Sequence, residues 1–498
     1  MDAFIAGFAL IASVEIWLTI LLGVVVGVTL GTVPGISTSM GIALMLPITF
    51  QMPLYQAIGM ILGLYVGGTS GALVTAILIN IPGNSSAIAT IWDGHPMARN
   101  GDAGRALGIG ILSSFVGGIF SLTILFMLAP RLARIALGFG GVEYFAIIVF
   151  SLTIVASVSG KSLSKGIISA TLGVIMTTVG MAPIDAVRRF TFGFRQLDAG
   201  FQLLPVLVGI YAVAEILRVA EKDKPLPEIL SFKLRGFGMT LREFKGQIVN
   251  YIRSCTIGTF IGILPALGTG IASIMAYSVA RNQSKTPEKF GTGHIEGIVA
   301  PESANSAVTG SAIIPVLTLG IPGDAGTALL LAALMIHGIT PGPLMFTTNI
   351  AIFNAHLAAL LLSNIFLIVV MYFGMRFFLR VLKVPTRILF PVVLVMCIVG
   401  AFSTNNRIFD VYSIIGIAVL GYALTKFKYP TAPFVMGFIL GDLFELYLRR
   451  GLMVTDGSFL AFFTRPIAAV IFIISFVFLA FTLYGRHKYK DKGFLEGV

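Results

Sequence analysis

The chain has 498 residues, of which 56% are hydrophobic and only 11% are charged. Soluble domains carry about 25% charged residues, so this composition excludes a soluble globular protein. The apolar runs are long and continuous, whereas a β-barrel has short alternating segments. The net charge of +12 is typical of basic cytoplasmic loops beside anionic lipid. Composition therefore predicts an all-α polytopic integral membrane protein.

The apolar runs begin near the N-terminus and recur to residue 484. No Lys or Arg precedes the first run, residues 5–33, so it lacks the basic region of a cleaved signal peptide and we expect it to be retained. A membrane crossing takes about 20 helical residues, and several runs are shorter. The short runs flank Pro and Gly residues, which is typical of broken or re-entrant helices. We expect about 11–14 membrane elements.

A polar stretch near the middle divides the chain into two halves. Residues 218–245 contain seven Lys or Arg, so the predicted linker, residues 218–247, lies in the cytoplasm. It separates a first membrane repeat, residues 1–217, from a second, residues 248–485. The basic tail, residues 486–498, is also expected in the cytoplasm, and the uncharged N-terminus outside it. The two halves would then have opposite topologies.

Two sequence blocks support this division because they recur in the same order. Residues 27–38 match residues 258–269 in their Gly, Pro and Thr positions, and residues 69–86 resemble residues 309–326. These blocks predict two inverted-topology repeats. Accidental recurrence in a chain with 56 glycines is the alternative. Gly35 follows Pro34 in the first half, whereas Ala266 follows Pro265 in the second. We therefore expect the second-half turn to allow fewer backbone conformations.

Each half contains two breaks in its apolar runs: residues 32–40 and 80–86 in the first, and 264–270 and 320–327 in the second. A helix that restarts after a break presents free N–H groups and a positive dipole end, which suit a carboxylate. A helix that stops presents carbonyls, which suit Na⁺. The predicted substrate-binding residues are Pro34, Gly35, Ser37, Thr38, Ser39, Asn80, Gly83, Asn84, Ser85, Ser86, Gly268, Thr269, Gly270, Gly323 and Thr327.

A packing role competes with function at these polar and small residues. Any single Ser or Thr can instead cap a helix or bond to a neighbouring helix. Small residues four positions apart usually form a close-packing face. We therefore assign packing to one group of glycines: Gly23, Gly27, Gly31, Gly258 and Gly262.

Asp324 is the candidate for a coupling-ion site, together with Asn305 and Ser306. An ionisable group at membrane depth is a functional hypothesis by default, and the first-half counterpart of Asp324 is the neutral Asn84. The alternative is an N-cap on a helix that begins at Ala325.

Two polar segments flank the breaks. The acidic pair Glu296 and Glu302 could hold a proton or Na⁺, and a charged loop at the membrane edge is an equal alternative. The stretch around Asp93, His95, Arg99 and Arg105 could shape a gate or contact substrate, although we favour a solvated loop for most of it.

The sequence offers little for enzymatic chemistry. It has no HExxH motif, no Cys/His cluster and no phosphate-binding GKS or GKT motif. Its two cysteines, Cys255 and Cys397, lie apart in apolar runs and predict neither a disulfide framework nor a metal site. We therefore expect no catalytic residues, no structural metal and no cofactor other than a coupling ion.

Several longer motifs resemble the large membrane subunit, TctA type, of the tripartite tricarboxylate transporter family. They are GxxxGxxPG at residues 27–35, NIPG at 80–83, DGHPMARNGDAGRALG at 93–108, GHIEGIVAPESANSAVTG at 293–310 and GIPGDAGTALLLAALMIHGITPGP at 320–343. Each motif alone is weak, but the set is ordered and covers most of both halves.

The resemblance implies the translocating subunit of a secondary active importer of tri- or dicarboxylates in the bacterial cytoplasmic (inner) membrane, coupled to Na⁺ or H⁺. It also implies two partners, a small four-helix membrane subunit and an extracytoplasmic solute-binding protein. Similarity to other binding-protein-dependent transporters implies an elevator-like mechanism. A stand-alone cation-coupled symporter, an ion channel and an intramembrane enzyme are the alternatives, and no nucleophile with a base is found for the last.

Overall fold

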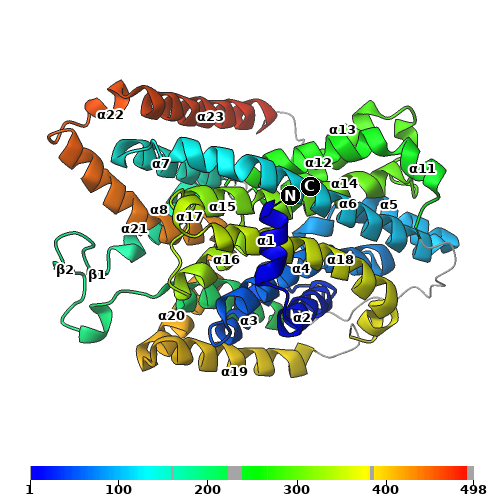
Figure 1. Cartoon of the computed structure of the whole chain (residues 1–498), viewed down its shortest axis with the longest axis horizontal. Coiled ribbons are helices and arrows are strands. Elements are labelled where there is room, and N and C mark those ends of the chain that lie inside the picture. The colour runs from blue at the N-terminus through cyan, green and yellow to red at the C-terminus, as the bar shows by residue number, and fades with distance from the viewer. Residues whose placement is uncertain (1, 159–161, 222–237, 266, 382–385, 491–498) are drawn as a thin grey trace. The chain divides into compact units, whose positions relative to one another are not determined.

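The computed structural model describes residues 2–158, 162–221, 238–265, 267–381 and 386–490. Nearly all of its regular structure is helical (Figure 1), and seven helices are long and apolar enough to cross a membrane. The prediction of an all-α polytopic membrane protein is confirmed. Most of the predicted linker lies outside the described residues, and so do the end of the tail and Ala266.

The chain forms two compact units, each built from segments on both sides of the linker. Unit 1 comprises residues 1–134 and 207–422. Its helices are α1 (Asp2–Leu10), α2 (Val14–Gly31), α3 (Thr38–Thr49), α4 (Leu54–Ile79), α5 (Thr90–Met97), α10 (Ala214–Ala220), α11 (Leu241–Gly246), α12 (Ile248–Ile263), α13 (Gly268–Gln283), α14 (Glu296–Ser311), α15 (Ile313–Leu319), α16 (Ala325–Ile336), α17 (Met345–Thr348), α18 (Ile350–Val381) and α19 (Thr386–Asn405).

Three helices extend across the limits of the units: α6 (Ala103–Ala136), α9 (Leu203–Val208) and α20 (Ile408–Lys426). Unit 1 also contains short 3₁₀ or π segments: η1 (Ser85–Ala87), η2 (Ala98–Asp102), η4 (Gly209–Val213) and η5 (Pro287–Lys289).

Close helix packing in unit 1 depends on glycine. A Cβ on Gly27 of α2 would lie 2.6 Å from the Leu64 carbonyl oxygen of α4, and one on Gly258 of α12 would lie 2.1 Å from the Ala304 oxygen of α14. Gly23, Gly31 and Gly262 meet facing helices just as closely. The packing role predicted for these glycines is therefore confirmed, since any side chain would separate the helix pairs.

Unit 2 comprises residues 135–206 and 423–498. Its elements are α7 (Gly141–Val158), α8 (Leu163–Thr177), β1 (Gly180–Met181), β2 (Arg188–Arg189), η3 (Arg195–Leu197), α21 (Thr431–Val454), α22 (Ala461–Thr464) and α23 (Pro466–Lys490). The antiparallel pair β1–β2 is anchored to α21 by two hydrogen bonds from Arg189 to Glu445, of 2.8 and 2.9 Å.

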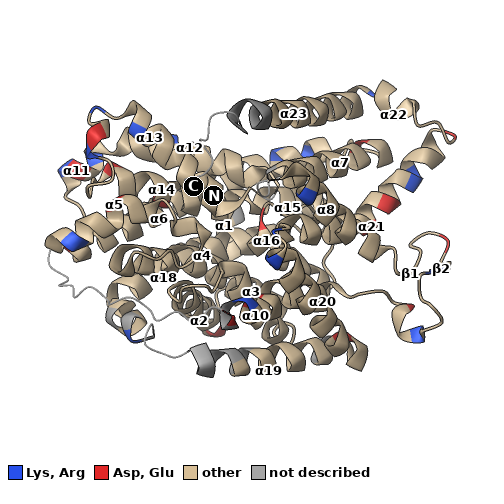
Figure 2. Ribbon diagram, turned by 180° about the vertical axis from the view of Figure 1, so that it is seen from behind, with Lys and Arg blue, Asp and Glu red and all other residues tan. Residues whose placement is uncertain are grey.

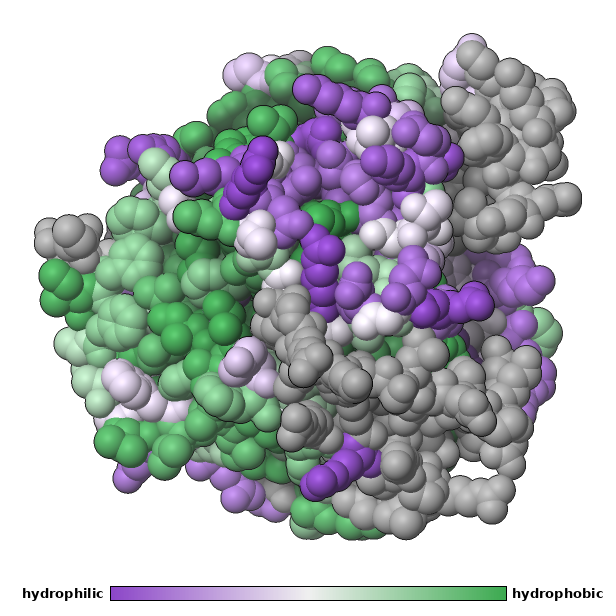
Figure 3. All heavy atoms as spheres, turned by 90° about the vertical axis from the view of Figure 1, so that its right-hand side faces the viewer, coloured by the Kyte–Doolittle hydropathy of each residue, from purple (hydrophilic) through white to green (hydrophobic). Residues whose placement is uncertain are grey.

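Charged residues are sparse along the helices and gather at a few places, among them α11 and its surroundings (Figure 2). Figure 3 views the side of Figure 1 on which α11 and α13 lie, and hydrophilic residues gather there beside a broad apolar area. An apolar surface of this kind suits contact with lipid.

Candidate functional site

The first break separates α2 from α3. Gly35 has φ +90°, a conformation that favours glycine. Ser37 then caps α3, since its Oγ accepts the Met40 N–H at 3.0 Å, and the same Oγ lies 3.0 Å from that of Ser39. Pro34 and Gly35 are only partly buried. The start of α3 is thus an N-terminal helix end with two clustered hydroxyls.

The second break follows α4, which ends in the left-handed residue Asn80 (φ +59°). Asn84 then joins this break to the first, because its Nδ2 donates to Thr38 Oγ1 and to the Gly68 carbonyl, each at 3.0 Å. Its Oδ1 accepts from the Ser86 N–H at 2.9 Å and the Ser86 hydroxyl at 2.6 Å. One amide thereby satisfies the Ser86 N–H at the break and links the break to α3 and to the middle of α4.

The second-half breaks have similar local chemistry. Gly268, with φ +68°, begins α13, so Thr269 and Gly270 lie in the first turn of that helix. Asp324 caps α16: its Oδ1 accepts the N–H and the hydroxyl of Thr327, each at 2.8 Å. The N-cap considered as an alternative for Asp324 is therefore present, whereas its role with a coupling ion stays a prediction.

Corresponding positions of the two halves have matching geometry. Asn80 and Gly320 are both left-handed, with φ of +59° and +72°. A Cβ on Gly83 would lie 2.2 Å from the Gly31 oxygen, and one on Gly323 would lie 2.6 Å from the Gly262 oxygen. In both halves, therefore, the IPG turn packs directly on the end of the helix before the other break.

The breaks of the two halves also meet each other within unit 1. Tyr65 of α4 donates its hydroxyl to Asp324 Oδ2 at 2.5 Å. Asn305 of α14 donates Nδ2 to the Ser86 carbonyl at 3.1 Å. A Cβ on Gly270 would lie 3.0 Å from Ser85 Cβ. Four segments far apart in sequence therefore converge.

Among the described residues, no Lys or Arg hydrogen-bonds or ion-pairs with the break residues. An anion bound there would depend on helix N-termini, hydroxyls and amides. Ser85 is exposed, while Ser37, Thr38 and Thr269 are half-buried, so these groups are accessible to a ligand.

Beside the breaks lies a fully buried carboxylate, Glu302, within α14. It accepts hydrogen bonds from the hydroxyls of Thr90 at 2.5 Å and Ser114 at 3.1 Å, and from Asn305 Nδ2 at 3.2 Å. Ser306 donates to Asn305 Oδ1 at 3.0 Å. The membrane-edge loop considered for Glu302 is wrong, since the side chain is inside a buried helix.

The segment around Asp93 also departs from the sequence prediction. Asp93 is fully buried, so a solvated loop is wrong for it. Its Oδ1 accepts the N–H groups of Gly291, Gly293 and His294 at 2.7–2.9 Å, and its Oδ2 accepts the Tyr277 hydroxyl at 2.9 Å. The carboxylate therefore fastens α5 to the loop before α14.

The remaining charged residues of these segments have peripheral positions. Arg99 is exposed and Arg105 pairs with Glu243 at 2.5 Å. His95 Nδ1 lies 3.0 Å from the Ile77 carbonyl, and Glu296 is half-buried, 3.9 Å from His294. None of them contacts a break residue through these interactions.

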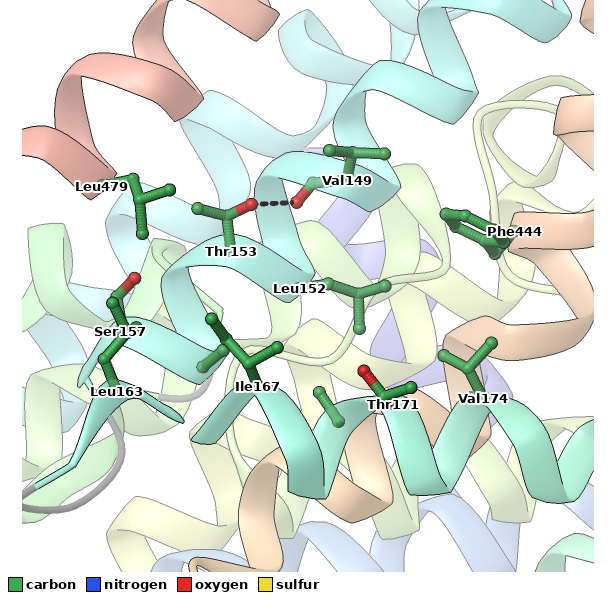
Figure 4. Close-up of a pocket in the computed structure, with 12 residues that line it drawn as sticks. Val149, Leu152, Thr153, Ser157, Leu163, Ile167, Thr171, Val174, Phe444 and Leu479 are labelled. Atoms are coloured by element: carbon green, nitrogen blue, oxygen red, sulfur yellow. Dashed lines mark hydrogen bonds between the residues drawn. The ribbon is translucent and has the colours of Figure 1, made fainter. Parts of the chain in front are cut away.

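Unit 2 contains a cavity of about 480 Å³ of a different character (Figure 4). Val149, Ile167, Val174, Phe444 and Leu479, from α7, α8, α21 and α23, line it with other apolar and hydroxyl side chains. Because its lining is mostly apolar, it does not suit a carboxylate.

Seven candidate membrane spans in the described part of the chain, together with the paired broken helices, define a polytopic membrane protein. The comparison with known families then identifies the family: residues 17–436 match the Tripartite tricarboxylate transporter TctA family. The chain belongs to this family, whose members are subunits of a tripartite tricarboxylate transporter.

Two relatives come from Agrobacterium vitis. One, an uncharacterized 52.8 kDa protein in the TAR-I ttuC′ 3′ region, is 37% identical over 475 residues, 95% of this chain and 94% of the relative. The other, an uncharacterized protein in the TAR-II ttuC′ 3′ region, is 39% identical over 240 residues, 48% of this chain and 99% of the relative. No solved structure matches the chain.

Proposed function

We propose that this chain is the translocating subunit of a secondary active importer of tri- or dicarboxylates. The observation that carries the proposal is the convergence of the helix breaks in unit 1, where Asn84 bonds to Thr38 and a Cβ on Gly270 would lie 3.0 Å from Ser85 Cβ. Helix N-termini and hydroxyls favour a carboxylate without a fixed positive charge. A site without a permanent cation also releases its anion more readily, which a transporter requires.

The mechanism we propose has two inverted repeats and elevator-like motion. The shared geometry of Gly83 and Gly323, and of Asn80 and Gly320, supports the repeats. The basic linker supports a cytoplasmic connection between them. We propose an extracytoplasmic N-terminus and a cytoplasmic C-terminus in the bacterial inner membrane.

Family membership supports other subunits, and we propose a small four-helix membrane subunit and an extracytoplasmic solute-binding protein. The coupling ion is Na⁺ or H⁺. The sequence makes Asp324 the candidate for its site, but Asp324 Oδ1 accepts the Thr327 N–H at the N-terminus of α16, and this helix end already stabilises the carboxylate. These contacts favour the capping role.

Uptake of radiolabelled tri- and dicarboxylates into proteoliposomes that contain the assembled system tests the proposal. Thr38→Ala and Thr269→Ala should each reduce uptake strongly, because each removes a hydroxyl from the start of a half-helix. Thr123→Ala is the matched control, since the exposed Thr123 hydroxyl donates to the Ile119 carbonyl of its own helix. Normal uptake in the Thr38→Ala, Thr269→Ala double variant would overturn the assigned site.

The same preparation separates the alternatives. A stand-alone symporter would transport without its partners, and a channel would pass ions without saturation. The proposal expects saturable uptake that requires the binding protein and stops when the cation gradient is collapsed.

A further inference from the structure

Three carboxylates of unit 1 are buried near the breaks, and they differ in what stabilises their charge. Asp93 receives three backbone N–H groups, and Asp324 receives the Thr327 N–H at a helix N-terminus. Glu302 receives only side-chain donors, and no basic side chain of the described residues pairs with it. A buried charge without a counter-charge is costly, so Glu302 is the carboxylate that most needs a cation.

The polar groups around Glu302 are able to bind a cation. Hydroxyl oxygens of Thr90 and Ser114 can accept as well as donate, because their hydrogens rotate. The side-chain amide of Asn305 carries an oxygen, and the Ser86 carbonyl lies 3.1 Å from Asn305 Nδ2. Carboxylate, hydroxyl, amide and carbonyl oxygens are the ligands of hard cations.

We propose that Glu302 binds the coupling ion and that this ion is Na⁺, with Thr90, Ser114 and Asn305 as the other side-chain ligands. The inference rests on the proposed transport function and adds the ion and its site. The inference assigns the ion to Glu302 instead of Asp324. The ligands of the ion then come from α5, α6 and α14.

The site is connected to the predicted substrate site by a continuous chain of hydrogen bonds. Asn305 bonds to both Glu302 and the Ser86 carbonyl, Ser86 bonds to Asn84, and Asn84 bonds to Thr38. Na⁺ that recruits the Asn305 oxygen must reorient this amide and so change its bond to Ser86. Na⁺ binding then alters the first-half breaks and so the affinity for the carboxylate substrate. By linkage, binding of the substrate changes the affinity for Na⁺ by the same factor.

The test compares Na⁺ binding with transport in the assembled complex. In the wild type, NaCl but not choline chloride should raise the apparent Tm, and a Na⁺ gradient should drive uptake. Glu302→Gln should abolish both Na⁺ effects. Ser114→Ala removes one ligand and should raise the Na⁺ concentration for half-maximal uptake about tenfold.

Ser113→Ala is the matched control: Ser113 is equally buried on α6, but its hydroxyl faces Tyr251 at 3.0 Å instead of Glu302. It should leave the Na⁺ response unchanged, and a tenfold change in this variant too would overturn the assignment. If Glu302→Gln does not fold, the comparison of Ser114→Ala with Ser113→Ala still decides. A Na⁺ response that persists in Glu302→Gln, or uptake driven by H⁺ alone, also overturns the inference.

Failure of the proposed function gives a different result. In that case the complex neither binds nor transports any carboxylate tested, but Na⁺ still raises the Tm and Glu302→Gln abolishes this rise. These results would support the ion site and reject the substrate class.

Discussion

Alanine at the two IPG turns should destabilise the transporter by steric overlap alone. A Cβ at position 83 would lie 2.2 Å from the Gly31 oxygen and 2.8 Å from Ala72 Cα, and a Cβ at position 323 would lie 2.6 Å from the Gly262 oxygen and 2.9 Å from Ala312 Cα. These neighbours are backbone atoms of packed helices and cannot rotate away. Neither glycine has a positive φ, so alanine adds no conformational strain.

Overpacking of a tight core costs about 1–3 kcal/mol. We place Gly83→Ala at the upper end of this range and Gly323→Ala lower, because the first overlap is deeper. The assays are thermal unfolding of the purified protein and carboxylate uptake at equal expression. Both variants should have a lower apparent Tm, and uptake should fall because the helix ends at residues 31 and 262 must shift.

Gly416→Ala is the control. A Cβ there meets nothing within 4 Å in α20, and alanine in a helix interior is favoured over glycine by about 0.5–1 kcal/mol. This variant should be at least as stable as the wild type. Wild-type Tm and uptake in Gly83→Ala and Gly323→Ala would refute the close contact between each turn and its helix.

Three further variants probe other contacts. Asp93→Ala should lower the apparent Tm, since three N–H groups and the Tyr277 hydroxyl lose their acceptor; an unchanged Tm would contradict the fastening role. Tyr65→Phe should cost about 1–3 kcal/mol by leaving Asp324 Oδ2 unsatisfied, as denaturant titration would measure. The Thr240 N–H and Arg105 lower the pKa of Glu243 in the folded protein. The stability that this carboxylate contributes is therefore complete above pH 4.5, its unfolded pKa, and is lost as the pH falls through the folded pKa. Glu243→Gln should remove this part of the loss of stability in acid.

The sequence was sufficient to locate the local features of the site. Pro and Gly at residues 34–35 and 82–83 predicted breaks, and the structure ends α2 and α4 just before them. The spacing of Asp324 before an apolar run predicted the N-cap alternative. Each of these features depends on neighbours within a few residues, which a sequence displays directly.

The long-range contacts could not be predicted in this way. Tyr65 and Asp324 are 259 positions apart, and Thr90 and Glu302 are 212 apart. A lone Tyr or Thr in an apolar helix has no pattern that names its partner. The same holds for Asp93: its turn-rich surroundings resemble a solvated loop, and only the fold brings three N–H groups to it.

The charge of the proposed tricarboxylate substrate exceeds what a single cation bound at Glu302 can balance. Moving an anion into a negative-inside cell costs about 2.3 kcal/mol per charge per 100 mV, so a trianion costs roughly 7 kcal/mol at 100 mV. More than three monovalent cations must therefore enter for the membrane potential to drive uptake. Glu302 can supply one negative charge when it is ionised, and the carboxylates of Asp93 and Asp324 already have N–H partners. The other cations must then bind with the substrate, whose carboxylates supply the remaining negative charge. Na⁺ affinity should consequently depend more steeply on carboxylate concentration for a trianion than for a dianion, and Glu302→Gln should abolish Na⁺-driven uptake of both.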